Sequence, residues 1–459
     1  MKHYKTYKKT GIIFLAIFIF FTNRLNAQVK RLNPDSLRND VNLLFKNIGE
    51  IHPDMFATLD EKDFAKELSA IKSKINSNAD IFDFYLLINS LVVKLNDGHT
   101  SISFPHNDLE QSNGLLFPFP IKINPGDSSV TITNDYTKSG NSIPVNSEVL
   151  SINGIQIKEI VGRMTQQVSG EQTFYRIDRL TYLFTPLLYA LYKSEEFEVE
   201  YRHNESIYNN RIQGISYYER YERRSQAADR ETIRPYSLQV DSMNSFAIID
   251  FRQFVDLENF TKFLDSTFTC LKNQKINNLI IDVRNNGGGN SRLGDELFQY
   301  ISKVPFKQYG QTTIKTSEQQ KNFFRSEYNI NDTSAIGVVT RSNEELIELR
   351  DNDLRFNGNV YVLQSHYTFS SASGFSWAFK YFGMGEIIGE ETGGLAVCFG
   401  DIVRQRLPYS GFSYTVSHKK FYQYGATDDN IHGTIPDYEV PANNALSFAV
   451  ELIKMKKQK

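Results

Sequence analysis

The chain has 459 residues, of which 40% are hydrophobic and 23% are charged, and its formal net charge is −2. This composition is typical of a globular protein, and the length is sufficient for two or three domains with sizeable cores. A nucleic-acid-binding protein needs a basic surface to neutralise phosphates, so the charge argues against that class.

The first residues have the pattern of a secretory signal peptide. Lysines in "MKHYKTYKK" precede the apolar run "GIIFLAIFIFF", and the small residue Ala27 follows within "NRLNAQ". The apolar run is short for a membrane span, although an uncleaved anchor is the alternative. We expect cleavage near Ala27, export to the periplasm or the medium, and no stable membrane insertion afterwards. Cleavage would remove basic and no acidic residues, so the exported chain is more acidic.

The first half of the chain changes from helical to β-type patterns. Residues 29–95 show helical periodicity, which ends at "LNDGHT", and "TSISF" then alternates like a strand. Residues 114–215 have β-type patterns between Gly, Pro, Asn and Asp, as in "SSVTITN" and "SEVLSINGIQI". The polar, charged stretch 219–235 is the best candidate for a domain boundary.

The second half has the pattern of a largely parallel sheet covered on both faces. Apolar strands alternate with helices, in the order "SFAIIDF", "LENFTKFLDSTFTCLK", "NLIIDVR", "NVYVLQ", "SASGFSWAFKYF" and "GEIIGE". Residues 303–358 interrupt this alternation as an irregular insertion, either a lid or a surface excursion. The only cysteines, Cys270 and Cys398, are too few for a disulfide framework and lack the clustered histidines of a zinc site, so we interpret both as buried thiols.

A run of three glycines follows the strand "NLIIDVR". Asn286 leads into Gly287, Gly288 and Gly289 at the carboxyl edge of the predicted sheet, where ligands of open α/β sheets bind. Bare N–H groups there could stabilise an oxyanion or hold a phosphate. The phosphate function is disfavoured, because the lysine tail and the spaced glycines of nucleotide-binding loops are absent. A tight turn that needs positive φ is the structural alternative.

Serines crowd the junction between "NVYVLQ" and the following helix. In "TFSSASGF", Ser370 and Ser371 lie at a strand-to-helix turn, a geometry that presents a nucleophile beside helix N–H groups. The alternative is that these serines cap the helix. A nucleophilic serine needs a base. His99 is the best placed histidine, in the loop between a helix and a strand, although a structural histidine is the alternative there.

Taken in order, these pieces resemble the tail-specific, or C-terminal processing, serine peptidase family. The resemblance rests on "LNDGHT", "SEVLSINGIQI", "LIIDVRNNGGG", "TFSSAS", "GEIIGEETGG" and "GTIPDYEV", and on "IHPDMF" near the start. It implies an α/β fold with a crotonase-like (ClpP/crotonase) catalytic core, a PDZ-like β module and a helical N-terminal region. The expected boundaries are 1–27 for the signal peptide, 28–105 for the helical region, 110–218 for the PDZ-like module and 236–457 for the catalytic domain.

The resemblance also implies roles for individual residues. Ser370 matches the nucleophile, and His99 matches the general base of the branch that resembles the tricorn core. The N–H group of Ser371, together with that of Gly288 or its neighbour Gly287, matches the oxyanion hole.

Two positions depart from the family patterns. Leu395 stands where the sister branch has a lysine base, so a Ser–Lys dyad is excluded. The tricorn-like branch has a glutamate that orients the histidine, and Asn430 holds the matching position here. An amide can hold an imidazole, but it stabilises the imidazolium less than a carboxylate does. Asp428 or Asp429 takes this role if the loop is shifted.

The sequence therefore predicts an exported serine endopeptidase that cleaves protein or peptide substrates through an acyl-enzyme, without a metal or an organic cofactor. One alternative is a weak or inactive family member that binds peptides or hydrophobic ligands. Aromatic tracts such as "RLTYLFTPLLYALY" would then line a groove, although such tracts usually belong to a core. Crotonase-type acyl-CoA chemistry is a second alternative, which export disfavours.

Overall fold

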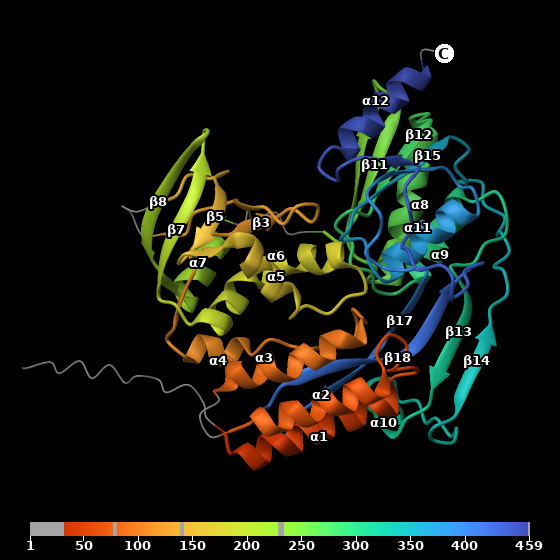
Figure 1. The fold of residues 1–459 in the computed structure, drawn as a ribbon. Helices are drawn as coiled ribbons and strands as arrows, with labels where there is room; N and C mark the ends of the chain where they lie inside the picture. The colour runs from red at the N-terminus through yellow and green to blue at the C-terminus, as the bar shows by residue number, and fades with distance from the viewer. Residues whose placement is uncertain (1–31, 77–79, 138–141, 228–233, 458–459) are drawn as a thin grey trace, which may run out of the picture.

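The computed structural model describes residues 32–76, 80–137, 142–227 and 234–457 as a mixed α/β protein (Figure 1). The predicted signal peptide at 1–27 lies outside the described residues. Within them, no helix combines the length and the apolar character that crossing a membrane requires.

The helices predicted between residues 29 and 95 are present. They are α1 (Pro34–Ile51), α2 (Glu61–Lys74) and α3 (Ile81–Val92), and the 3₁₀ helix η1 (Val93–Leu95) follows directly. Their predicted apolar faces pack into one core, in which Val41 and Ile88 are fully buried. Asn96 ends η1 with a left-handed φ of 54°, as the sequence predicts. The chain then passes through a short loop into β1 (Ser101–Ile102).

The middle of the chain contains the predicted strands and four helices, α4 to α7, that were not predicted from the sequence. The strands form a six-stranded and a two-stranded sheet, made of β3 (Ile121–Ile123), β4 (Val130–Ile132), β5 (Glu148–Ile152), β6 (Ile155–Gln156), β7 (Glu196–His203) and β8 (Ser206–Gln213), and of β2 (Leu115–Leu116) and β9 (Ile215–Ser216). The helices α4 (His106–Gln111) and α7 (Tyr217–Ala227) flank this part.

The prediction of β-type structure throughout residues 114–215 is wrong at α5 (Ile157–Thr165) and α6 (Thr173–Tyr192). The aromatic tract belongs to α6. Its apolar residues Leu180, Phe184 and Leu187 recur at helical spacing and are fully buried in the same core as the N-terminal helices. One face of the tract is therefore ordinary core. In Figure 1, α6 runs between the sheet of β7 and β8 and the part of the chain that carries α11.

The predicted parallel sheet forms the core of the C-terminal half. Strands β11 (Phe246–Phe251), β12 (Asn278–Asp282), β15 (Asn359–Gln364), β16 (Glu386–Gly389) and β19 (Tyr438–Glu439) are parallel neighbours, and β10 (Tyr236–Asp241) pairs antiparallel at one edge. Alternate side chains point to opposite faces. One face packs in a cluster with α8 (Leu257–Asn273), α9 (Arg292–Ile301) and α11 (Ser371–Tyr381), and the other packs against α12 (Ala445–Lys457).

A five-stranded sheet connects the N-terminal helices to this core. Strands β17 (Val397–Arg406) and β18 (Ser413–Gln423) form a long hairpin, and β18 also pairs with β1 and with β13 (Tyr309–Lys315). The expected irregular insertion at 303–358 is in part regular, because it contains β13, α10 (Glu318–Tyr328) and β14 (Val339–Asn343). The pairing of Ser101 with Thr415 holds the loop before β1 against the core.

Candidate active site

Ser370 occupies a strained position at the start of α11. Its backbone has φ of 52° and ψ of −128°, a conformation that a residue with a Cβ adopts rarely, and its side chain makes no capping hydrogen bond to the helix. The hydroxyl instead lies 3.1 Å from the Nε2 atom of His99. The neighbouring hydroxyls of Ser371 and Ser373 donate to backbone oxygens at 2.6 and 2.9 Å. Ser370 therefore differs from its neighbours, because its hydroxyl faces a base.

His99 is held from both sides of its loop. The Thr415 hydroxyl on β18 donates to the His99 carbonyl at 2.7 Å, and the imidazole stacks on Phe369 with ring centroids 4.7 Å apart. Only 16% of the side chain is exposed. Burial lowers the pKa of His99 below its ordinary value, although the charge of Asp97 acts in the opposite direction. The imidazole is thus neutral near pH 7 and is able to accept a proton.

Asp97 is the acidic residue beside His99. Its Oδ1 atom accepts from the His99 backbone N–H at 2.8 Å and lies 3.8 Å from His99 Nδ1, beyond hydrogen-bond distance. Its Oδ2 atom accepts from the Ser417 hydroxyl at 2.7 Å and lies 3.3 Å from His52 Nε2. Burial alone would raise the pKa of Asp97, but the interactions with His52 and His99 outweigh burial and hold that pKa well below the ordinary value. The carboxylate therefore remains ionised.

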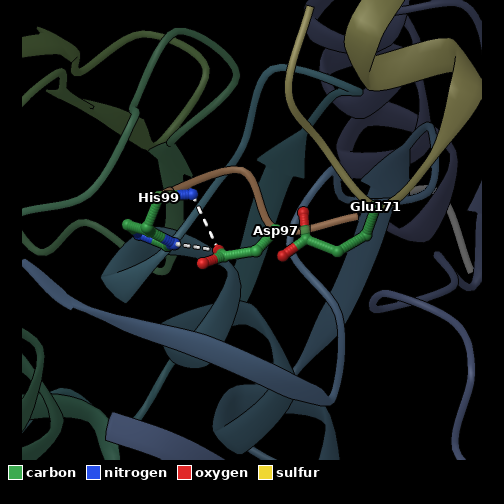
Figure 2. Close-up of side chains that lie close together, drawn as sticks. All are labelled: Asp97, His99 and Glu171. Atoms are coloured by element: carbon green, nitrogen blue, oxygen red, sulfur yellow. Dashed lines mark hydrogen bonds and ion pairs between the residues drawn. The ribbon is translucent and has the colours of Figure 1, made fainter. Parts of the chain in front are cut away.

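Glu171 completes this buried group from a different part of the chain. It lies in the segment between α5 and α6, and its side chain extends toward Asp97 (Figure 2). Both carboxyl oxygens are buried, and neither has a hydrogen-bond partner among the described residues. Burial and the charge of Asp97 raise the pKa of Glu171 to about 8. Glu171 is thus mainly protonated at neutral pH.

The same three side chains are the ones that could hold a metal ion. The ligand atoms of Asp97, His99 and Glu171 lie within 4.8 Å of one another. The sequence analysis assigned no role to Asp97 or Glu171. Asp97 could have been found from its place two residues before His99 in "LNDGHT", but no sequence pattern marks Glu171, because only the fold brings it here.

The glycine run lies directly against the serine turn. Gly288 has a φ of 97°, and a Cβ atom on it would lie 2.7 Å from Ser370 Cβ and 2.8 Å from the Ser371 nitrogen. The Gly288 N–H donates to the Asn286 side chain at 2.9 Å. Among the described residues, no acceptor is hydrogen-bonded to the N–H of Gly287 or to that of Ser371. The structure thus brings the Ser370 hydroxyl close to the N–H groups of Gly287, Gly288 and Ser371. The Gly288 N–H, however, already donates to Asn286.

Of the three candidates for the residue that orients His99, Asn430 and Asp428 have other side-chain partners, whereas Asp429 makes only a backbone contact among the described residues. Asn430 accepts from the Thr427 N–H at 2.8 Å within its own turn. Asp428 accepts from Tyr422 and Lys420 at 2.9 and 3.1 Å, and the Asp429 carbonyl accepts from the Ile431 N–H. None of these contacts involves His99. The acidic side chain that the structure places beside His99 is Asp97.

A cleft of about 450 Å³ opens beside this group. Its walls come from the His99 loop, the glycine run, the serine turn, α6 and the β17–β18 hairpin, through Gly98, His99, Ser101, Tyr175, Arg179, Tyr182, Leu183, Gly287, Tyr367, Phe369, Ile402 and Thr415. His99 lines the cleft directly, and Phe369, the residue before Ser370, lines it too, so the cleft opens next to the Ser370–His99 pair. The arrangement can therefore support acyl transfer to a serine.

Comparison with known proteins gives a family match to the part of the chain that carries Ser370. Residues 245–440 match the sequence profile of Peptidase family S41, a range that includes the glycine run and Ser370. The chain carries a peptidase family S41 domain. This family consists of serine-type peptidases and implies peptide substrates, in agreement with the predicted enzyme class. A search of curated proteins found no significant match.

Solved structures show that the likeness extends beyond the S41 domain. The structure of mature CPAF matches at 13% identity with a TM-score of 0.63, covering 93% of this chain and 97% of that chain. Mature CPAF complexed with lactacystin matches at 13% identity with a TM-score of 0.62, covering 93% and 98%. The photosystem II D1 C-terminal processing protease matches at 14% identity with a TM-score of 0.45, covering 91% and 97%. At these identities, the two CPAF structures show a shared fold.

Proposed function

We propose that this S41 protein is an exported serine endopeptidase in which Ser370 is the nucleophile and His99 is the general base. The observation that carries the proposal is the 3.1 Å contact between Ser370 Oγ and His99 Nε2. The two residues come from the N-terminal region and the S41 domain, so no local feature of the sequence brings them together. The strained backbone of Ser370 supports the same role, because such strain is common at catalytic residues.

The proposed reaction is acyl transfer through a covalent intermediate. His99 Nε2 takes the Ser370 proton as Oγ attacks the peptide carbonyl, and then gives that proton to the leaving amine. Water hydrolyses the acyl-enzyme with His99 again acting as the base. Of the predicted oxyanion donors, Ser371 and Gly287 have N–H groups without an acceptor among the described residues, whereas Gly288 donates to Asn286. A backbone donor of this kind lowers the barrier by about 3 kcal/mol.

Asp97 is the proposed partner of the protonated His99. Its carboxylate does not reach Nδ1 in a hydrogen bond, but 3.8 Å is close enough to stabilise the imidazolium by charge. His52 fixes that carboxylate. The His52 Nδ1 atom accepts from the Asp54 N–H at 3.1 Å, so the proton of this imidazole is on Nε2, which lies 3.3 Å from Asp97 Oδ2. This arrangement takes the place of the glutamate expected from the tricorn-like branch.

The domain assignments remain part of the proposal. A crotonase-like core at 236–457 agrees with the parallel sheet that carries Ser370 and the glycine run. A PDZ-like module at 110–218 would bind an extended peptide by strand addition. Export rests on the sequence pattern of residues 1–27 alone.

The test is covalent labelling with a fluorophosphonate, which reacts with activated serines. Mature protein, beginning after Ala27, would be labelled, and the modified residue would be identified by peptide mass mapping. Labelling at Ser370 that is lost in both Ser370→Ala and His99→Ala is the expected result. Ser373→Ala is a matched control on the next turn of α11. Failure of well-folded protein to label would favour the peptide- or ligand-binding alternative.

A further inference from the structure

Arg179 is a cation without an anion in the cleft beside His99. It extends from α6, and it lines the cleft together with His99 and Gly287. Its Nη1 atom reaches the Gly98 carbonyl at 3.5 Å and the Tyr175 hydroxyl at 3.4 Å, both at the limit of a hydrogen bond. A guanidinium has five N–H donors, so most of the donors of Arg179 have no strong acceptor.

No carboxylate in the described part of the chain lies within 4 Å of the Arg179 guanidinium. Glu171 is near enough to affect Arg179 electrostatically, but no ion pair joins the two side chains in the described part of the chain. The lining of the cleft contains no aspartate or glutamate among the described residues. Within the described residues Arg179 is therefore not paired with a carboxylate, although the protein carries more acidic than basic residues overall.

Aromatic packing fixes Arg179 in relation to the catalytic pair. Its guanidinium lies over the Tyr175 ring, 5.7 Å from the centroid. Tyr175 stacks on Phe369 at 4.3 Å, and Phe369 stacks on His99 at 4.7 Å. Because Phe369 directly precedes Ser370, this continuous stack sets the distance between Arg179 and the nucleophile. A group bound to Arg179 would therefore be held at a constant distance from the scissile bond.

A second cavity extends the basic surface away from the site. It has a volume of about 370 Å³, shares Tyr182 with the first cleft, and includes Arg220 and Arg224 in its lining. No acidic residue of the described chain lines it either. Arg220 donates to the Phe117 carbonyl at 2.9 Å. The surface between α6 and α7 thus presents arginines and tyrosines to a bound chain.

We propose that Arg179 binds a carboxylate of the peptide substrate next to the scissile bond, so that the enzyme prefers peptides with an acidic side chain or a free C-terminus at that position. This inference rests on the proposed peptidase function. Arginine suits this role because its planar N–H fork matches a carboxylate in a bidentate geometry. Arg179 would be a specificity-determining residue, since it contacts the substrate but takes no part in proton transfer.

The first step of the test identifies cleavage sites. Mature wild-type protein would digest a proteome-derived peptide library, and mass spectrometry would align the products on the scissile bond. The expected result is enrichment of aspartate, glutamate or a peptide C-terminus at one fixed position. A preferred peptide would then be synthesised in three forms: unchanged, with the acidic residue replaced by its amide isostere, and with an amidated C-terminus.

The second step assigns the preference to Arg179. Wild-type protein is expected to favour the carboxylate form over its amide form by roughly 10- to 100-fold in kcat/KM, the effect of one charge-assisted hydrogen-bonded pair. Arg179→Met should reduce that ratio to about 1, and Arg179→Lys should retain part of it. Arg176→Met is the matched control. Arg176 lies on the same helix but lines a different cavity, so the ratio should remain that of wild type.

Each outcome separates the inference from the proposed function. Loss of cleavage on side-chain amidation identifies an acidic residue as the ligand, and loss on terminal amidation identifies the C-terminus. Equal cleavage of all three peptides, or a preference that persists in Arg179→Met, would overturn the inference while leaving a working peptidase. If wild-type protein neither labels at Ser370 nor cleaves any peptide, both the proposed function and this inference are wrong.

Discussion

His52 and Asp97 form a buried pair beneath the Ser370–His99 contact, with His52 Nε2 3.3 Å from Asp97 Oδ2. Both side chains are almost completely inaccessible to solvent. The Asp54 N–H donates to His52 Nδ1, and the His99 backbone N–H donates to Asp97 Oδ1, so each member of the pair is held by a backbone hydrogen bond. Since a buried carboxylate needs partners to remain charged, this pair supplies a fixed negative charge behind the proposed base.

The first prediction concerns the identity of the residue that supports His99. Asp97→Asn should reduce kcat/KM by about 10² to 10⁴, because the imidazolium formed during catalysis loses its anion. Asn430→Ala should reduce it by less than about threefold, since Asn430 contacts its own turn. Peptide hydrolysis by the two variants, with circular dichroism to verify folding, makes the comparison. The reverse order of effects would restore Asn430 as the orienting residue.

The second prediction concerns the acidic side of the pH profile. Burial lowers the pKa of His99 from its ordinary value of 6.5, so the folded protein keeps this imidazole neutral to a lower pH. We therefore expect kcat/KM to fall only below pH 6.5, as protonation removes the base. Initial rates between pH 4.5 and 8, on protein that remains folded, measure this. A midpoint above 6.5 would contradict the burial argument.

The third prediction concerns Glu171 and stability. The pKa of Glu171 is about 8 in the folded protein against an ordinary 4.5. At a pH between these two pKa values, Glu171 has lost its proton in the unfolded chain but keeps it in the folded protein. The contribution of Glu171 to stability is thus complete below about pH 4.5 and is lost as pH rises through 8. Glu171→Gln cannot ionise and should unfold at a higher denaturant concentration than wild type at pH 8, with a smaller difference at pH 5.

Urea denaturation of both proteins at the two pH values measures this difference. Glu159→Gln is a matched control, because Glu159 lies on the exposed side of α5 and pairs with Arg163 at 2.6 Å. This control should leave the pH dependence of wild type unchanged. A Glu171→Gln variant whose denaturation midpoint follows wild type at both pH values would show that Glu171 is not protonated in the folded state.

The fourth prediction concerns the contact between the glycine run and the serine turn. Gly288→Ala should abolish peptidase activity and fluorophosphonate labelling, because the new Cβ would lie 2.7 Å from Ser370 Cβ and the backbone has a φ of 97°. Gly337→Ala is the matched control. Gly337 also has a positive φ, 82°, but nothing lies within 4 Å of its added Cβ. Full activity in Gly288→Ala would show that catalysis does not need the close contact between Gly288 and Ser370.

Several parts of the fold could be predicted from local sequence alone. Apolar runs bounded by turn residues predicted strands β11, β12, β15 and β16, and helical periodicity predicted α1 to α3, because burial of one face leaves a pattern in the sequence. The β-type prediction for residues 114–215 missed α5 and α6, although the apolar residues of α6 carry the helical period. Aromatic and β-branched residues favour strands in isolation, whereas packing of α6 into the core decides for a helix.

The sequence by itself also determined which residue types were available for chemistry. It supplied a serine after a buried strand, a glycine run after another, and a histidine in a loop, and it excluded a lysine base at Leu395. These features follow from local order in the chain. They left open whether Ser370 was a cap or a nucleophile.

Only the tertiary structure decided which of these groups meet. Ser370 and His99 are 271 positions apart, and they are brought together when β1 pairs with β18 across two parts of the chain. The same packing buries Asp97 and the Glu171 carboxyl group and turns Arg179 into the cleft. Burial and charge pairing depend on neighbours that are distant in sequence, so the pKa of each group is a property of the fold.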